Sequence, residues 1–258
     1  MTSFKIDQVA LQLYTLRDFC KTPTDLAATA QKVRKIGYQS VQISGVGVQP
    51  PEAKKILNEA GLTICATHES SDFIRQDPEA VCERLHQAGV KHTAFPYPSG
   101  VDFGDETSVR NLARQLEHAG AVLAKRGFTL SYHNHAIEFV RFGPLTVLDY
   151  IYQATSPDHL KAELDTYWIQ YGGGDPVAWI EKMSGRMSLL HLKDFAFLKD
   201  GKAAFAEIGQ GNLNWRRILA AAEKSGAEWL IIEQDTCAGD PFDSIRISFD
   251  YIQKLLAE

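Results

Sequence analysis

Short apolar runs rich in β-branched and aromatic residues alternate with helix-like stretches along the whole chain. Strands that alternate with helices are typical of βα units, and consecutive βα units build a parallel sheet. This alternation therefore restricts the chain to an α/β architecture. Eight runs are candidate strands: Val9–Tyr14, Ser40–Ile43, Thr63–Thr67, His92–Phe95, Thr129–His133, Lys161–Leu164, Ser188–Leu192 and Trp229–Glu233.

The stretches between these runs carry helix start and stop signals. The segment 22–25 (Thr-Pro-Thr-Asp) supplies an N-cap, a proline at the first helical position and an acid three residues after the cap, and Gly37 ends the stretch. Asp77-Pro78 and Asp175-Pro176 open two further helices in the same way. Eight strands alternating with helices in 258 residues match a (β/α)8 TIM barrel, so we predict one such domain over residues 1–258.

A doubly wound open sheet is the main alternative fold. It requires a glycine-rich phosphate-binding turn after an early strand. The first run leads instead into Tyr14-Thr15-Leu16-Arg17-Asp18, and the later Gly209-Gln210-Gly211 lacks both a third glycine and a preceding strand. The barrel is therefore the expected fold.

Charge and cysteine content exclude several classes of partner. The chain has 27 basic and 32 acidic side chains, a net charge of −5, so it offers no positive field for nucleic acid or an anionic membrane. Its four cysteines form no C-x-x-C motif, which fits a reducing compartment. Asp7 interrupts the first segment and no run reaches about 18 apolar residues. We expect a cytoplasmic protein with no nucleic acid or membrane as partner; pairing into a homo-oligomer stays open.

Side chains able to bind a metal lie at or just after the ends of the last four strands. Glu138 follows the fifth, Asp165 the sixth, His191 lies in the seventh and Glu233 ends the eighth. The carboxyl ends of barrel strands meet at one face, so these groups converge there. Three carboxylates and one imidazole suit a borderline-hard divalent cation. We predict one metal site formed by these four residues, with Mn²⁺ as the expected ion and Mg²⁺, Co²⁺ or Zn²⁺ as alternatives.

The ligand from the fifth strand has an alternative. Regular alternation places His133 and His135 on one face of this strand and Glu138 on the other. Glu138 reaches the centre only if the strand ends or bulges near His135; otherwise His133 or His135 is the ligand. Glu163 shares a face with Asp165, one layer deeper, and is expected to support the ligands.

Five motifs together resemble the sugar phosphate isomerase/epimerase family of xylose isomerase-like TIM barrels. The likeness covers nearly the whole chain and is strongest between residues 132 and 235. The motifs are Tyr132-His133-Asn134-His135-x-x-Glu138-Phe139, Glu163-Leu164-Asp165-x-Tyr167-Trp168, His191-Leu192-Lys193-Asp194, Gly209-x-Gly211-x-x-x-Trp215 and Ile232-Glu233.

The resemblance implies a divalent metal that stabilises the enediolate formed from an α-hydroxy ketone. It also implies that the two glutamates, Glu138 and Glu233, act as acid and base. Four residues near the same strand ends are candidates for substrate binding: His68, His135, Trp168 and Lys193. The expected substrate is a small sugar, and the acidic loops after the last two strands favour an unphosphorylated one.

Three functions are compatible with this site. The first is a metal-dependent isomerase or epimerase of an unphosphorylated ketose or keto-sugar. The second is a lyase, dehydratase or hydratase that acts on a 3-keto-glycoside or on an inosose-like keto-cyclitol through the same metal and acid–base pair. The third, from another class, is a non-catalytic sugar-binding or partner subunit.

Overall fold

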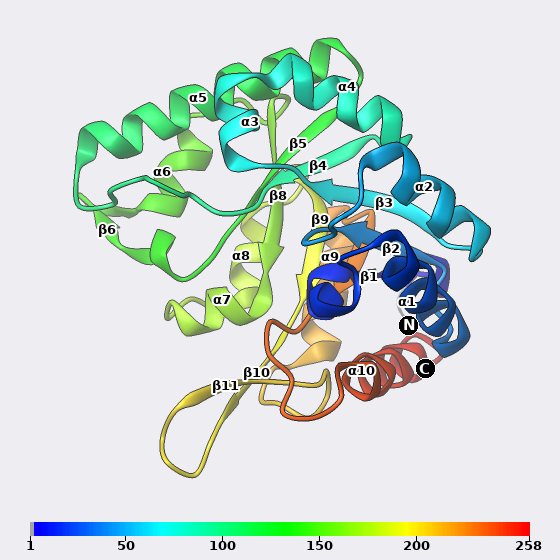
Figure 1. Ribbon diagram of the computed structural model, residues 1–258. Coiled ribbons are helices and arrows are strands. Elements are labelled where there is room, and N and C mark those ends of the chain that lie inside the picture. Colours follow the sequence, from blue (N-terminus) through cyan, green and yellow to red (C-terminus); the bar gives the residue numbers. More distant parts are fainter. Residues whose placement is uncertain (1–2) are drawn as a thin grey trace.

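Eight parallel strands close into a barrel in the computed structural model, which describes residues 3–258 (Figure 1). The first two residues of the domain expected over 1–258 lie outside this described part. Around the barrel each strand pairs with its neighbours in the order β1-β12-β9-β8-β5-β4-β3-β2. The strands are β1 (Val9–Gln12), β2 (Ser40–Ile43), β3 (Thr63–His68), β4 (His92–Phe95), β5 (Thr129–His133), β8 (Leu160–Asp165), β9 (Met187–Leu192) and β12 (Trp229–Ile232).

The predicted (β/α)8 barrel is thus confirmed, and all eight predicted strands are present. The ends differ by one or two residues. The largest difference is in the first strand, where Leu13 and Tyr14 belong to a 3-10 helix (Leu13–Phe19) instead of the strand. A second 3-10 turn (Ile6–Gln8) precedes β1.

Ten α-helices surround the barrel within the described residues, and most begin where the sequence signals predict. Thr22 caps α1 by accepting a hydrogen bond from Asp25 N, and Asp77 caps α4 through Ala80 N. The helices are α1 (Pro23–Ile36), α2 (Pro50–Glu59), α3 (Ser71–Gln76), α4 (Pro78–Ala88), α5 (Glu106–Lys125), α6 (Val147–Gln153), α7 (Thr166–Tyr171), α8 (Pro176–Lys182), α9 (Trp215–Ser225) and α10 (Pro241–Leu256). No helix among residues 3–258 has the length and apolar character needed to cross a membrane.

Two hairpins are inserted in loops at the carboxyl ends of strands. A short one, β6 (Arg141–Phe142) and β7 (Leu145–Thr146), follows the 3-10 turn Ile137–Phe139. A longer one, β10 (Asp194–Phe197) and β11 (Ala203–Ala206), projects away from the barrel (Figure 1).

The barrel interior is apolar at its base and polar above. A small cluster of Ala10, Cys65, Ala66, Leu189 and Ile231 fills the base, separate from the larger core between the strands and the helices. The apolar base excludes water from below, so the polar side chains of the layers above face the carboxyl-end mouth.

Asp194 organises the loop that begins at the longer hairpin. Its buried carboxylate accepts hydrogen bonds from the backbone N–H groups of Phe195, Gly209, Gly211 and Leu213 and from the indole N–H of Trp215, at 2.7 to 3.2 Å. The His191-x-Lys193-Asp194 and Gly209-x-Gly211-x-x-x-Trp215 motifs are therefore two halves of one structural unit.

We expect Asp194→Asn to destabilise the protein by roughly 2–4 kcal/mol, because an amide N–H₂ would face N–H donors and leave some of them buried without an acceptor. Urea denaturation followed by circular dichroism measures the loss. Asp200→Asn, in the exposed turn of the same hairpin, is the matched control and should change stability by less than about 0.5 kcal/mol. Equal stabilities for the two variants would contradict this role for Asp194.

Candidate metal centre and substrate cavity

A cavity of about 410 Å³ opens at the carboxyl-end mouth of the barrel. A monosaccharide or a cyclic polyol fits a space of this size. Imidazoles and charged side chains from several strands line it, together with aromatic residues of the surrounding loops: Tyr14, Arg17, His68, Tyr97, His133, His135, Lys193, Glu233 and Asp235 are among the lining residues.

Four side chains at the upper level form a compact donor group, which we call the mouth set: His133, Asp165, His191 and Glu233. One donor atom from each lies within 4.8 Å of the others. Their side chains are nearly or completely buried. Three of the four predicted ligands therefore converge, and His133, the alternative fifth-strand ligand, completes the group instead of Glu138.

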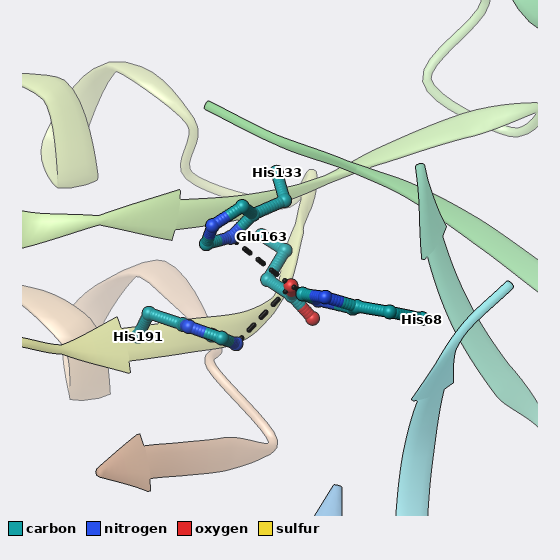
Figure 2. A group of neighbouring side chains, drawn as sticks. All are labelled: His68, His133, Glu163 and His191. Atoms are coloured by element: carbon teal, nitrogen blue, oxygen red, sulfur yellow. Dashed lines mark hydrogen bonds and ion pairs between the residues drawn. The ribbon is translucent and has the colours of Figure 1, made fainter. Parts of the chain in front are cut away.

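A second group, the deep set, lies around Glu163 and consists of His68, His133, Glu163 and His191 (Figure 2). The Oε1 atom of Glu163 is 2.5 Å from His68 Nε2 and 3.2 Å from both His133 Nδ1 and His191 Nε2. The two sets share His133 and His191. One ring nitrogen of each shared histidine faces Glu163, while the other lies toward Asp165 or Glu233, at 3.9 Å and 2.7 Å respectively.

The end of β8 explains how Asp165 is held. Its Oδ1 atom caps helix α7 by accepting a hydrogen bond from Trp168 N at 3.0 Å, and its backbone N–H donates to Asn134 Oδ1 at 3.0 Å. The second oxygen, Oδ2, is buried and accepts no hydrogen bond among the described residues. The Asp165-x-x-Trp168 motif thus fixes the carboxylate through Oδ1 and directs Oδ2 toward the mouth set.

Lys193 places a buried ammonium among the acidic groups of the cavity wall. Its Nζ atom is 3.1 Å from Asp165 Oδ2, 2.9 Å from Glu233 Oε2 and 2.8 Å from Asp235 Oδ1. Burial opposes the charged form, but these three carboxylates outweigh it and raise the pKa of Lys193 well above its ordinary value. The lysine is therefore protonated in the resting site.

The buried acids and cations around His191 shift one another's pKa values. Burial disfavours the imidazolium, yet Glu163 and Glu233 raise the pKa of His191 to about 10. Burial also favours neutral Glu233, but Lys193 and His191 hold the pKa of Glu233 well below its usual range. For Asp165, burial prevails and raises the pKa to about 6. An excess of acidic groups is concentrated at this point.

The mouth set fits a divalent metal. Two imidazoles and two carboxylates are a suitable donor set for Mn²⁺, Zn²⁺ or Co²⁺. The buried Oδ2 atom of Asp165 agrees with this donor role: it accepts no hydrogen bond among residues 3–258 and forms an ion pair with Lys193 Nζ at 3.1 Å.

Glu138 lies outside the mouth set, and its predicted place there does not match the structure. Strand β5 ends at His133, and the following 3-10 turn carries Glu138 to the outer side of the strand. There its carboxylate accepts hydrogen bonds from Tyr132 Oη at 2.9 Å and from His135 N at 2.8 Å. The strand does end two residues before His135, but the 3-10 turn that follows does not bring Glu138 into the mouth set.

Glu138 should instead make stability depend on pH. Burial raises its pKa from 4.5 to about 7, so the folded state favours the protonated carboxyl, and the protein loses stability as the pH rises from about 4.5 to about 7. A rise from 4.5 corresponds to about 3 kcal/mol. We expect Glu138→Gln, which cannot ionise, to remove this loss between pH 5 and pH 8. Urea denaturation at both values tests this, with exposed Glu52→Gln as control; an unchanged pH dependence in Glu138→Gln would contradict it.

The predicted substrate-binding residues differ in their positions. Lys193 and His135 line the cavity, and the buried Nδ1 atom of His135 has no hydrogen-bond partner among residues 3–258. Burial and the nearby Lys193 lower the pKa of His135 to about 3, so this imidazole is neutral. His68 also lines the cavity, but its Nε2 atom contacts Glu163. Trp168 packs against His135, with ring centroids 5.3 Å apart, and is not among the residues that line the cavity.

Sequence reasoning missed Gln42 and did not assign Asp235 a role. Gln42 lies in β2 with no exposed surface, and it contacts both Glu163 and His191. Its signal was a glutamine between two apolar strand residues, Val41 and Ile43. Asp235 follows the eighth strand and pairs with Lys193.

Comparisons with known proteins agree with this fold. A family model described as xylose isomerase-like TIM barrel matches residues 30–255. The inosose dehydratase of Geobacillus kaustophilus (strain HTA426) is 23% identical over 265 residues, covering 87% of this chain and 85% of that protein. The inosose dehydratase of Mesomycoplasma hyopneumoniae (strain 7448) is 24% identical over 290 residues, covering 96% and 95%.

Solved structures give the same architecture. A sugar phosphate isomerase/epimerase from Parabacteroides distasonis ATCC 8503 superposes with a TM-score of 0.80 at 22% identity, covering 98% of this chain and 96% of that one. A xylose isomerase-like TIM barrel protein from Mycobacterium smegmatis in complex with magnesium gives a TM-score of 0.72 at 15% identity, covering 96% of both chains. At these identities the likeness establishes the fold.

Proposed function

Because the chain belongs to the xylose isomerase-like TIM barrel family, we propose that it is a metal-dependent lyase that removes water from an unphosphorylated cyclic polyhydroxy ketone. The family includes enzymes that act on sugars and related polyols. Two curated relatives that match most of the chain are named inosose dehydratases, which supports a keto-cyclitol as the substrate class.

The contact between Lys193 and Glu233 is the observation that supports elimination of water as the reaction. Their Nζ and Oε2 atoms are 2.9 Å apart, and both side chains line the substrate cavity. A proton donor therefore stands beside a proton acceptor on one wall. Elimination of water needs such a pair: one group to take a proton from carbon and another to give a proton to the departing hydroxyl.

The proposed steps use both groups in turn. Glu233 takes the proton from the carbon next to the carbonyl, and the electron pair of that C–H bond is first held as an enolate on the carbonyl oxygen. The pair then forms a carbon–carbon double bond as the C–O bond on the next carbon breaks. Lys193 donates a proton to the departing oxygen, which leaves as water. The proton held by Glu233 then returns to Lys193 across 2.9 Å, so the site ends in its starting state.

His133, Asp165, His191 and Glu233 would hold the metal. When bound, a divalent ion supplies Lewis-acid polarisation of the substrate carbonyl, which makes the neighbouring C–H acidic. The unpartnered Nδ1 of neutral His135, which lines the cavity, is available to bind a substrate hydroxyl.

The position of Glu138 weighs against epimerisation. Epimerisation returns the proton to the opposite face of the same carbon, and the scheme expected from the sequence used Glu138 and Glu233 as its acid and base. Glu138 is hydrogen-bonded to Tyr132 on the outer side of β5. The lyase, the second of the sequence-based hypotheses, is therefore preferred.

The proposal is tested with the Mn²⁺-loaded protein in D₂O. Inosose, a ketohexose and a 3-keto-glucoside are incubated separately and followed by proton NMR and ultraviolet absorbance. We expect inosose to lose its α-hydrogen and a molecule of water. A change of configuration without loss of water would contradict the lyase assignment. Absence of hydrogen exchange with every compound would support a non-catalytic sugar-binding protein instead.

A further inference from the structure

A chain of hydrogen bonds below the mouth set ends on His191. It starts at Glu163, whose Oε2 atom accepts from Gln42 Nε2 at 2.7 Å. The other end of the Gln42 amide, Oε1, lies 2.7 Å from His191 Nε2 and also accepts from Gln12 Nε2 at 2.9 Å. Gln12, Gln42, Glu163 and His191 have no exposed surface, so water does not compete for these bonds.

The orientation of the Gln42 amide is fixed by its surroundings. A carboxylate only accepts hydrogen bonds, so Glu163 selects the N–H₂ end of the amide. Turning the amide over would place its carbonyl against the carboxylate of Glu163 and its N–H₂ group against the N–H₂ group of Gln12. The carbonyl of Gln42 must therefore face His191, and the Nε2 atom of His191 must carry the hydrogen.

We propose that Gln42 is a positioning residue that makes Nδ1 of His191 its metal-ligating atom, with Glu163 acting through Gln42. A metal would displace the hydrogen that His191 Nδ1 shares with Glu233 Oε2, and the hydrogen kept on Nε2 would then leave the single lone pair of the neutral imidazole on Nδ1. Nδ1 lies 2.7 Å from Glu233 Oε2, within the mouth set. This inference rests on the proposed metal centre.

The hydrogen bond between His191 Nε2 and the carbonyl of Gln42 also indicates which of the two donor sets would hold the metal ion. The deep set faces His191 through Nε2, which lies 3.2 Å from Glu163 Oε1. With Nε2 held as an N–H donor to Gln42, His191 has no lone pair to offer there. The deep set is therefore the hydrogen-bonded support of the metal centre, and the ion belongs to the mouth set.

The experiment identifies the ligating nitrogen directly. Protein labelled with ¹⁵N in its histidines is loaded with Zn²⁺, and long-range proton–nitrogen spectra assign both ring nitrogens of His191. We expect Nδ1 to be bound to zinc and Nε2 to carry hydrogen. In Gln42→Met, calorimetry should show Zn²⁺ affinity reduced by about 10–100-fold, with a fraction of His191 ligating through Nε2.

Gln12→Met is the matched control, because Gln12 is equally buried and contacts Gln42 but not His191, and Glu163 still fixes the orientation of the Gln42 amide in this variant. It should change zinc affinity by less than about threefold and leave Nδ1 ligated. Ligation through Nε2 in the wild-type protein overturns the proposal, as do equal losses of affinity in the two variants. The wild-type spectrum alone decides if Gln42→Met fails to fold. Failure of the wild-type protein to bind zinc would instead refute the metal centre, and with it the proposed function.

Discussion

Lys193→Met is expected to stop elimination while the substrate still exchanges its α-hydrogen with D₂O. Methionine has a similar volume but no proton to give, so the departing hydroxyl loses its acid, whereas Glu233 remains as the base. General acid catalysis contributes about 10²–10⁴-fold, and the rate of water loss should fall by that factor. Proton NMR of inosose in D₂O measures exchange and elimination in the same sample.

The exposed Lys199→Met, in the turn between β10 and β11, is the control for this change and should keep both rates. Equal loss of exchange and elimination in Lys193→Met would show that the lysine acts before C–H cleavage. Unchanged elimination would show that another group protonates the leaving oxygen, and would remove the basis for the lyase proposal.

Glu233→Gln is expected to abolish both exchange and elimination and to weaken metal binding. The carboxylate is at once a member of the mouth set and the proposed base, and an amide cannot take a proton at neutral pH. We expect the affinity for Mn²⁺ to fall by more than about 100-fold, because even residues that merely support metal ligands contribute 10–100-fold. Titration calorimetry measures the affinity, and deuterium exchange reports on the base.

Glu228→Gln is the matched control for this second change. Glu228 precedes the same strand, β12, at the opposite end of the barrel, where it lies 3.5 Å from His92. It should retain the affinity for Mn²⁺ and the rate of exchange. Wild-type affinity in Glu233→Gln would exclude this carboxylate as a ligand, and wild-type exchange would exclude it as the base.

The proposed base and acid are Glu233 and Lys193, and this pair differs from the two glutamates that the sequence led us to expect. Lys193 directly follows β9 and Glu233 directly follows β12, and these two strands are neighbours in the barrel, so both side chains lie on one wall. A substrate lying over that wall presents a hydrogen and the hydroxyl of the next carbon to the two groups. Elimination on one face of the ring is the outcome that this geometry favours.

The sequence alone determined the architecture and most of the donor groups. Alternating apolar runs and capped helices leave a parallel barrel as the expected solution, and the strand-end position of Asp165, His191 and Glu233 directs them to one mouth because all parallel strands end on the same side. These inferences need only local periodicity and the direction of the strands.

The tertiary structure decided which residues complete the site. A strand that ends one residue earlier or later sends the following side chains to the other face, so the end of β5 at His133 determined that this histidine joins the mouth set while Glu138 pairs with Tyr132. The contacts of Gln42 with Glu163 and His191 depend on closure of the barrel, which brings residues 121 and 149 positions apart within 2.7 Å. Local patterns in the sequence carry no information about such distant contacts.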